Sequence, residues 1–143
     1  MNSTTTSLDT NLLVYLLNQD NALNQRALAA IEESRGRGPL IVSGAVYAEL
    51  LGLPSGTQAV LDEFFTLGGI QTDWRFDETI WRAAGIAFQG YVERRLAGTA
   101  LLPRRILTDF LIGAHALVRG HTLLTTDSRH YAAAFPTLQI IAA

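Results

Sequence analysis

The sequence contains no cysteine, no lysine and no long apolar run. Without cysteine the chain forms no disulfide, holds no metal through thiolates and uses no cysteine nucleophile. Any bound metal ion must therefore be held by oxygen or histidine ligands. No apolar run approaches the ~20 residues that a membrane-spanning helix needs. Residues 1–7 are polar and lack the basic region of an export signal, so we expect a cytoplasmic protein.

Positive charge is also scarce, since the net charge is −2. This argues against a protein coated with positive charge for tight, sequence-independent binding of nucleic acid. It does not exclude a nuclease, because carboxylates in an active site make the total acidic while a local basic rim remains. All 11 basic residues are arginine, which suits phosphate recognition by the planar guanidinium group; a biased codon composition is an equally good explanation.

The length and composition indicate a compact globular protein. With 143 residues, of which 48% are hydrophobic and 17% charged, we expect one domain over residues 1–143 with its own hydrophobic core. Strand-like and helix-like stretches alternate along it. The expected strands are 5–8, 40–42, 70–74, 122–126 and 138–141. The expected helices are 12–17, 22–33, 45–51, 58–67, 78–96, 106–118 and 129–135.

This alternation, with strands that are continuous apolar runs, predicts an α/β fold. We expect three α/β/α layers around a central, mostly parallel sheet of four to five strands. Local signals mark the helix ends: Ser43 and Asp77 stand where they could cap a helix, and Gly68–Gly69 and Gly120 stand where helices should stop.

Two aspartates, Asp9 and Asp127, directly follow predicted strands. Ligands of parallel sheets bind outside the carboxyl ends of the strands, so both residues stand where chemistry is expected. Either residue alone could simply be a helix N-cap.

Glu49 and Asp109 interrupt apolar helices instead. Both lie on the inward stripe of their helix, where an unpaired carboxylate is costly. Beside Asp109 on its helix, Gly113 is small enough to let that helix approach the sheet closely. A rival pair, Asp62–Glu63, lies on an amphipathic helix and is better explained as part of a solvated face.

Four carboxylates that meet at the strand ends cannot all stay ionised unless a cation neutralises them. Mg²⁺ and Mn²⁺ prefer oxygen ligands and use a few carboxylates together with substrate phosphates. Such an ion activates water and offsets the charge of an attacked phosphate. If the four acids converge, the expected reaction is phosphodiester hydrolysis.

Four segments resemble, in order and spacing, the acidic motifs of PIN domains, and in particular of the VapC-type toxins of bacterial type II toxin–antitoxin pairs. They are 7–16 (SLDTNLLVYL), 48–50 (AEL), 109–116 (DFLIGAHA) and 123–131 (LLTTDSRHY). The resemblance covers nearly the whole chain. Each motif alone is weak, but the four together are specific. His115 departs from the pattern, since a smaller residue is more usual there.

The resemblance implies endonucleolytic cleavage of RNA with Mg²⁺ or Mn²⁺ at an acidic quartet. Carried over, the quartet is Asp9, Glu49, Asp109 and Asp127, with Asp9 and Asp109 as the best candidates for direct metal ligation. The resemblance also makes Asn11 and Thr126 polar supports of the site, although both could merely cap or turn the chain. It further implies a homodimer and a small antitoxin protein as partner.

Several arginines and aromatic residues have alternative explanations. Arg104, Arg105 and Arg129 could contact RNA phosphates near the acidic residues, or could be solvent-exposed charges beside loops. Trp74 and Trp81 are expected to pack, since stacking on bases usually requires neighbouring basic residues in the sequence.

Two other functions remain open. An aspartyl-phosphate phosphohydrolase of the haloacid dehalogenase type would use Asp9, but its second acid is replaced by Asn11 and its basic anchor, often lysine, is absent. A catalytically weak PIN-like module that only binds RNA or protein is the non-enzymatic alternative.

Overall fold

A computed structural model of the chain describes residues 3–18, 22–54, 56–98 and 107–143. Within these residues five strands form one parallel sheet, in the order β3-β2-β1-β4-β5. The strands are β1 (Thr6–Leu8), β2 (Leu40–Ser43), β3 (Ile70–Asp73), β4 (Thr122–Thr125) and β5 (Ile140–Ala142). The expected α/β fold with a parallel sheet of four to five strands is confirmed.

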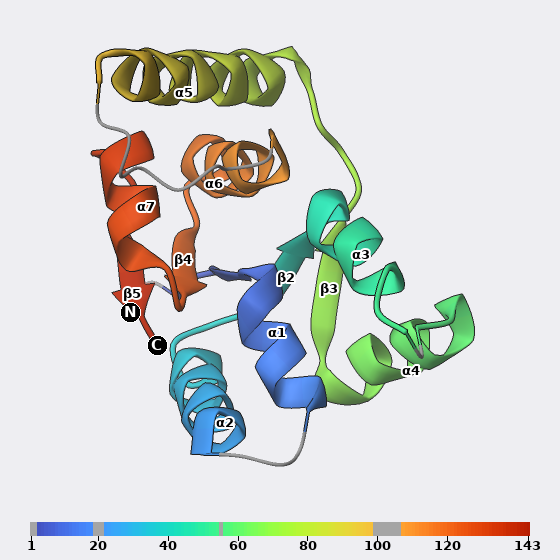
Figure 1. The fold of residues 1–143 in the computed structure, drawn as a ribbon. Helices are drawn as coiled ribbons and strands as arrows, with labels where there is room; N and C mark the ends of the chain where they lie inside the picture. The colour runs from blue at the N-terminus through green and yellow to red at the C-terminus, as the bar shows by residue number, and fades with distance from the viewer. Residues whose placement is uncertain (1–2, 19–21, 55, 99–106) are drawn as a thin grey trace.

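Helices cover both faces of the sheet (Figure 1). They are α1 (Thr10–Leu17), α2 (Ala22–Arg35), α3 (Gly44–Leu51), α4 (Gln58–Gly68), α5 (Glu78–Leu96), α6 (Leu107–Arg119) and α7 (Ser128–Ala134). In the view of Figure 1, α5 and α6 lie above the sheet and α1 and α2 lie below it. α5 packs on α6, and α1 packs on α2. The result is the expected α/β/α layering.

The helix ends follow local chemistry, with one exception. Asp77 caps α5 as expected, because its carboxylate accepts a hydrogen bond from the Ile80 N–H. Gly69 ends α4 with a φ of 63°, in the left-handed region that favours glycine. Ser43 precedes α3, but its hydroxyl makes no capping hydrogen bond and is buried without a partner within the described part of the chain. The prediction of a Ser43 cap was wrong.

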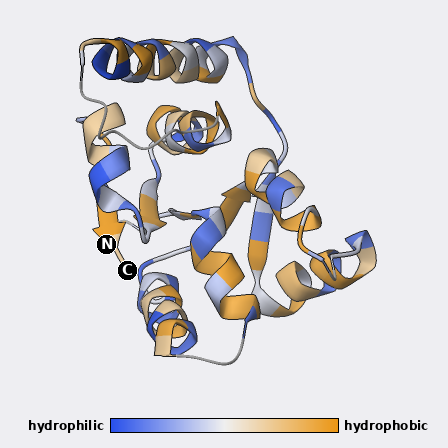
Figure 2. Cartoon of the chain, in the orientation of Figure 1, coloured by the Kyte–Doolittle hydropathy of each residue, from blue (hydrophilic) through white to orange (hydrophobic). Residues whose placement is uncertain are grey.

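The centre of the sheet is the core of the molecule. Leu8 of β1, Val42 of β2, and Leu123 and Leu124 of β4 are fully buried. Adjacent residues of β4 are both buried because helices cover the two faces, which explains why the strand sequences are continuous apolar runs. The helices, in contrast, mix hydrophobic and hydrophilic residues (Figure 2). No helix in the described residues is long and apolar enough to cross a membrane.

A close contact fixes α6 against the segment that follows α7. Gly113, one turn after Asp109, faces the ring of Phe135, and a Cβ placed on Gly113 would overlap that ring, with the ring atom Cζ at 3.0 Å. Phe135 is itself buried. We expected the small residue Gly113 to let α6 approach the sheet closely. The group that lies against Gly113 is the ring of Phe135. Because α6 carries Asp109 in its first turn, this contact sets where that carboxylate lies.

We expect Gly113→Ala to destabilise the fold, although alanine is normally the better helix former. Overpacking of a buried contact costs about 1–3 kcal/mol, which exceeds the roughly 0.5–1 kcal/mol that alanine gains over glycine inside a helix. Urea denaturation would measure the free energy of unfolding. The control is Gly85→Ala in α5, where an added Cβ meets nothing within 4 Å and should stabilise. Stabilisation by both substitutions would contradict the contact.

Candidate functional site

Asp9 stands between β1 and α1 and is 4% exposed. Its Oδ1 accepts hydrogen bonds from the Thr10 N–H (2.8 Å) and from the Tyr131 hydroxyl (3.2 Å), and its Oδ2 accepts one from the Thr125 hydroxyl (2.7 Å). Asp9 is thus a helix cap, as its position alone suggested. The two hydroxyl contacts, from residues far along the chain, are more than a cap requires.

Burial dominates the electrostatics of Asp9. It raises the pKa of the Asp9 carboxyl above its usual value of 3.8, although hydrogen bonds from Thr125, Thr10 and Tyr131 act in the opposite direction. The negative charge of Glu49 raises the Asp9 pKa further. A buried carboxylate beside another carboxylate keeps its charge most easily when a cation lies nearby.

Glu49 lies on α3 and is half-buried rather than enclosed in the core. Its Oε1 accepts a hydrogen bond of 2.6 Å from the Thr10 hydroxyl. Thr10 therefore links two acids, because its backbone N–H binds Asp9 and its side chain binds Glu49. Sequence analysis did not single out Thr10.

Asp109 lies in the first turn of α6, and Asp127 lies directly before α7, the helix that carries Tyr131. The Tyr131 side chain is buried, with 1% exposure. Burial raises the pKa of the Tyr131 hydroxyl, and the negative charges of Asp9, Asp109 and Asp127 raise it further. The charges of all three carboxylates therefore act on one hydroxyl, which donates its hydrogen bond to Asp9. Asp127 occupies the N-cap position of α7, yet its side chain makes no capping hydrogen bond, so capping does not explain this residue.

The donor set suits a hard divalent cation, because every candidate ligand is a carboxylate oxygen. In the residues that the structure describes, however, no group of three or more histidine, aspartate or glutamate side chains is arranged to hold a metal ion. Mg²⁺ commonly uses only one or two carboxylates and completes its shell with water and substrate phosphates. The residues fit such an ion in chemistry but do not form a closed protein cage.

The hydroxyls that support Asp9 come from Thr125 and Tyr131, whereas Asn11 and Thr126 are exposed. The sequence pointed to Thr126 as a support of the site, whereas the threonine that binds Asp9 is its neighbour Thr125. The register explains the difference: Leu8 of β1 pairs with Leu124 of β4, so the next residues along the two strands, Asp9 and Thr125, lie side by side. Alternation along a strand then turns Thr126 away.

The predicted basic and aromatic residues fall in different places. Arg129 is exposed on α7, next to the acidic residues in sequence. Arg104 and Arg105 lie outside the described residues. Trp74 and Trp81 are 63% and 51% exposed, yet both pack on aromatic side chains as expected, Trp74 edge-on against Tyr47 and Trp81 edge-on against Phe76. The indole N–H of Trp81 also donates a hydrogen bond to the carbonyl of Phe76.

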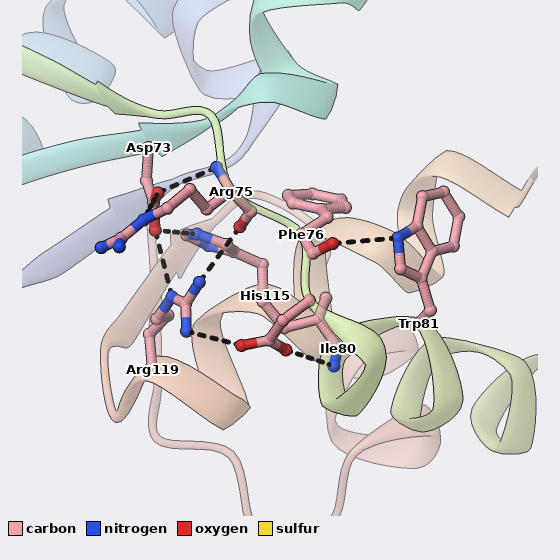
Figure 3. Close-up of polar contacts among 8 residues, drawn as sticks. Asp73, Arg75, Phe76, Ile80, Trp81, His115 and Arg119 are labelled. Atoms are coloured by element: carbon pink, nitrogen blue, oxygen red, sulfur yellow. Dashed lines mark hydrogen bonds and ion pairs between the residues drawn. The ribbon is translucent and has the colours of Figure 1, made fainter.

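A second polar cluster lies at the end of β3, the edge strand (Figure 3). The Oδ2 of Asp73 accepts hydrogen bonds from His115 Nε2 (2.9 Å) and Arg119 Nε (3.1 Å), and its Oδ1 accepts one from the Arg75 N–H. Arg119 also binds Asp77 at 3.2 Å and the Arg75 carbonyl. This cluster ties α6 to the connection between β3 and α5, and it accounts for the unusual His115.

His115 is fully buried. Burial lowers the pKa of its imidazole below 6.5, although the hydrogen bond that it donates to Asp73 acts in the opposite direction. We therefore assign the neutral ring, with the proton on Nε2 donated to Asp73. Burial would raise the pKa of Asp73, but the hydrogen bonds from His115, the Arg75 N–H and Arg119 outweigh it and lower that pKa to about 2.

Comparisons with known proteins agree with the fold. A family model of the PIN domain matches residues 7–136. Similar solved structures are VapBC2 from Rickettsia felis bound to a DNA fragment from its promoter (20% identity, TM-score 0.70, 97% of this chain and 98% of that chain) and VapBC-1 from nontypeable Haemophilus influenzae (19%, 0.70, 97% and 98%). FitAcB from Neisseria gonorrhoeae is another (21%, 0.60, 95% and 96%). No curated protein sequence matches significantly.

We expect Thr125→Val to lower the free energy of unfolding by about 1–3 kcal/mol, because it leaves the buried Oδ2 of Asp9 without a hydrogen-bond donor. Denaturant titration followed by circular dichroism would measure the change. The matched control is Thr126→Val, the same substitution at the exposed neighbour, which should change stability by less than about 0.5 kcal/mol. Equal effects would show that Thr125 is not the support of Asp9.

Asp73→Asn should lower the free energy of unfolding at pH 7 by up to about 2 kcal/mol. Because the folded-state pKa of Asp73 lies below the usual 3.8, at about 2, its stabilisation is complete above pH 3.8 and is lost as the pH falls towards 2. The difference between wild type and variant should therefore shrink in denaturation curves recorded from pH 7 down to pH 3. Glu93→Gln, on the exposed face of α5, is the control. A difference independent of pH would refute the assignment.

Proposed function

Because the chain belongs to the PIN domain family, we propose that it is a Mg²⁺- or Mn²⁺-dependent endoribonuclease and the toxin of a type II toxin–antitoxin pair. The observation that carries this proposal is the hydrogen bonding of Asp9, which Thr125 and Tyr131 hold through their hydroxyls and which Thr10 links to Glu49. Asp9 and Asp127 also follow the neighbouring parallel strands β1 and β4, and substrates of parallel sheets bind beyond the carboxyl ends of the strands.

Asp9 and Asp109 are the proposed direct ligands of the ion, and Glu49 and Asp127 complete the acidic site. A divalent ion supplies a Lewis acid there, which activates water and offsets the charge of the attacked phosphate. The protein's own contribution is to hold Asp9 still. Hydroxyls of Thr125 and Tyr131 bind its two oxygens from the interior side. Such outer contacts orient a ligating carboxylate before the ion arrives.

RNA is the proposed substrate, as the resemblance of the four acidic motifs to VapC-type toxins implies. Arg129 is the proposed contact to an RNA phosphate among the described residues, because it is exposed two positions after Asp127. Asn11 and Thr126 are proposed as polar groups on the exposed side of the site, facing the substrate rather than supporting Asp9.

A protein partner is the second part of the proposal. Two of the similar structures are of VapBC proteins, which supports a small antitoxin as partner of this chain. An apolar groove of about 500 Å³ between α1, α3 and α4 includes Val14, Leu50, Val60 and Phe64. Its lining suits the apolar face of a partner helix. Leu50 of this groove directly follows Glu49 in α3. A homodimer is also proposed, from the resemblance alone.

Asp9→Asn should abolish divalent-ion-dependent cleavage of RNA, since it removes a ligand charge while keeping the shape of the side chain. Cleavage of a mixed single-stranded RNA with Mg²⁺ or Mn²⁺ would be followed on gels, with EDTA as a second way to stop it. Growth inhibition on expression should disappear in parallel. Circular dichroism should show an intact fold.

The matched control is Glu63→Gln on the exposed face of α4, which should leave the cleavage rate unchanged. If Asp9→Asn cleaves RNA as fast as wild type, the catalytic assignment is wrong. If pure wild type binds RNA but never cleaves it with either ion, the alternative of a binding module replaces the nuclease.

A further inference from the structure

The arginines of this protein are unevenly paired. Nine of the 11 lie in the described residues. Five form ion pairs with carboxylates, namely Arg35, Arg37, Arg75, Arg82 and Arg119. Arg95 lies over the ring of Tyr91, and Arg94 also has a partner. Within the described part of the chain, Arg26 and Arg129 are left without an acidic or aromatic partner.

Arg26 lines a cavity of about 230 Å³ between α1, α2 and the turn from β4 to α7. α1 and α2 pack side by side below the sheet in Figure 1. The cavity has an apolar floor, Leu12 and Ala27, which are buried, and its walls include Tyr15 and Thr126. A cavity of this size has room for roughly seven waters, which is enough for a group as large as a nucleobase.

Two residues that line this cavity lie next to residues of the acidic site along the chain. Thr126 stands between Thr125, whose hydroxyl binds Asp9, and Asp127. Leu12 lies in the first turn of α1, the helix that Asp9 caps. Because consecutive Cα atoms are about 3.8 Å apart, the cavity wall at Thr126 lies close enough to Asp127 for one RNA strand to reach both.

The positive charge of Arg26 indicates what kind of group this cavity could bind. An acidic cluster repels a polyanion, so a nuclease of this kind needs cations close to the site to hold its substrate. Paired arginines contribute little, because their charge is already neutralised by a carboxylate. The guanidinium of Arg26 could bind a phosphate, and Tyr15 and Thr126, which line the same cavity, supply an aromatic ring and a hydroxyl, groups that suit a base and its sugar.

We propose that the cavity between α1, α2 and the β4–α7 turn binds the nucleotide next to the cleaved bond of single-stranded RNA, with Arg26 on its phosphate. The base lies against Tyr15 and the apolar floor, and the Thr126 hydroxyl contacts the sugar or phosphate. This inference rests on the proposed ribonuclease function and extends it to a substrate-positioning residue, Arg26.

The first test measures binding without cleavage. In an Asp9→Asn background with Mg²⁺ present, a fluorescent single-stranded RNA of about 12 nucleotides is titrated by anisotropy at several salt concentrations. Arg26→Gln should weaken binding about tenfold and reduce the slope of log affinity against log salt by about 0.7, the value for one phosphate contact on a single strand. Arg26→Lys should keep most of the slope, because it keeps the charge.

The matched control is Arg82→Gln, which removes an exposed arginine that is paired with Glu78 on α5. It should change neither the affinity nor the slope. Because Arg26 is exposed, its substitution should leave the melting temperature unchanged. In the active protein, Arg26→Gln should raise KM for RNA about tenfold and leave kcat within about twofold of wild type.

The outcomes separate this inference from the function on which it rests. If wild type cleaves RNA and Arg26→Gln behaves like Arg82→Gln, the cavity is not a nucleotide site and the ribonuclease proposal stands. If the Asp9→Asn protein binds no RNA and wild type cleaves none, both proposals fail together. A loss of kcat with unchanged KM would place Arg26 in the chemistry rather than in substrate binding and would also overturn the inference.

Discussion

A carboxylate held inside the protein is the constraint around which the rest of the molecule is organised. Asp9 follows the central strand, and its three hydrogen bonds come from the start of α1, the end of β4 and the middle of α7. Each bond requires its segment to lie near the carboxyl ends of the central strands. The parallel order β2-β1-β4 is what brings those segments there, since parallel strands end at the same edge.

Much of this arrangement follows from local sequence pattern. Apolar runs identify the strands, and the two aspartates that follow strands are found by position alone. The supports of Asp9 are harder to predict, because the choice between Thr125 and Thr126 depends on the register between β1 and β4. The role of Tyr131 could not be predicted either, because a tyrosine in an apolar helix is usually a packing residue. Only the tertiary contact reveals that its hydroxyl binds Asp9. The exposure of Trp74, which directly follows the edge strand β3, likewise depends on which strand forms the edge.

The polar clusters around Asp73 and around Asp9 differ in how their charge is balanced. Around Asp73 the acid is matched by Arg119 and by the neutral imidazole of His115, so charge is balanced within the protein and the cluster stabilises the fold. Around Asp9 the balance is missing, since hydroxyls and an N–H are the donors and other carboxylates are the neighbours. A net charge of −2 is thus compatible with a nuclease whose excess negative charge is concentrated where a cation is needed.

The distances along the chain between Asp9 and its supports affect how the protein is made. Thr125 is 116 residues and Tyr131 is 122 residues away from Asp9. During synthesis, domains fold from the N-terminus as the chain emerges, but the central strand cannot gain its β4 neighbour until most of the polypeptide has left the ribosome. Contacts of such long range also form slowly. An interrupted translation product that ends before β4 would carry Asp9 without Thr125 and Tyr131, the residues whose hydroxyls hold its carboxylate in the complete fold.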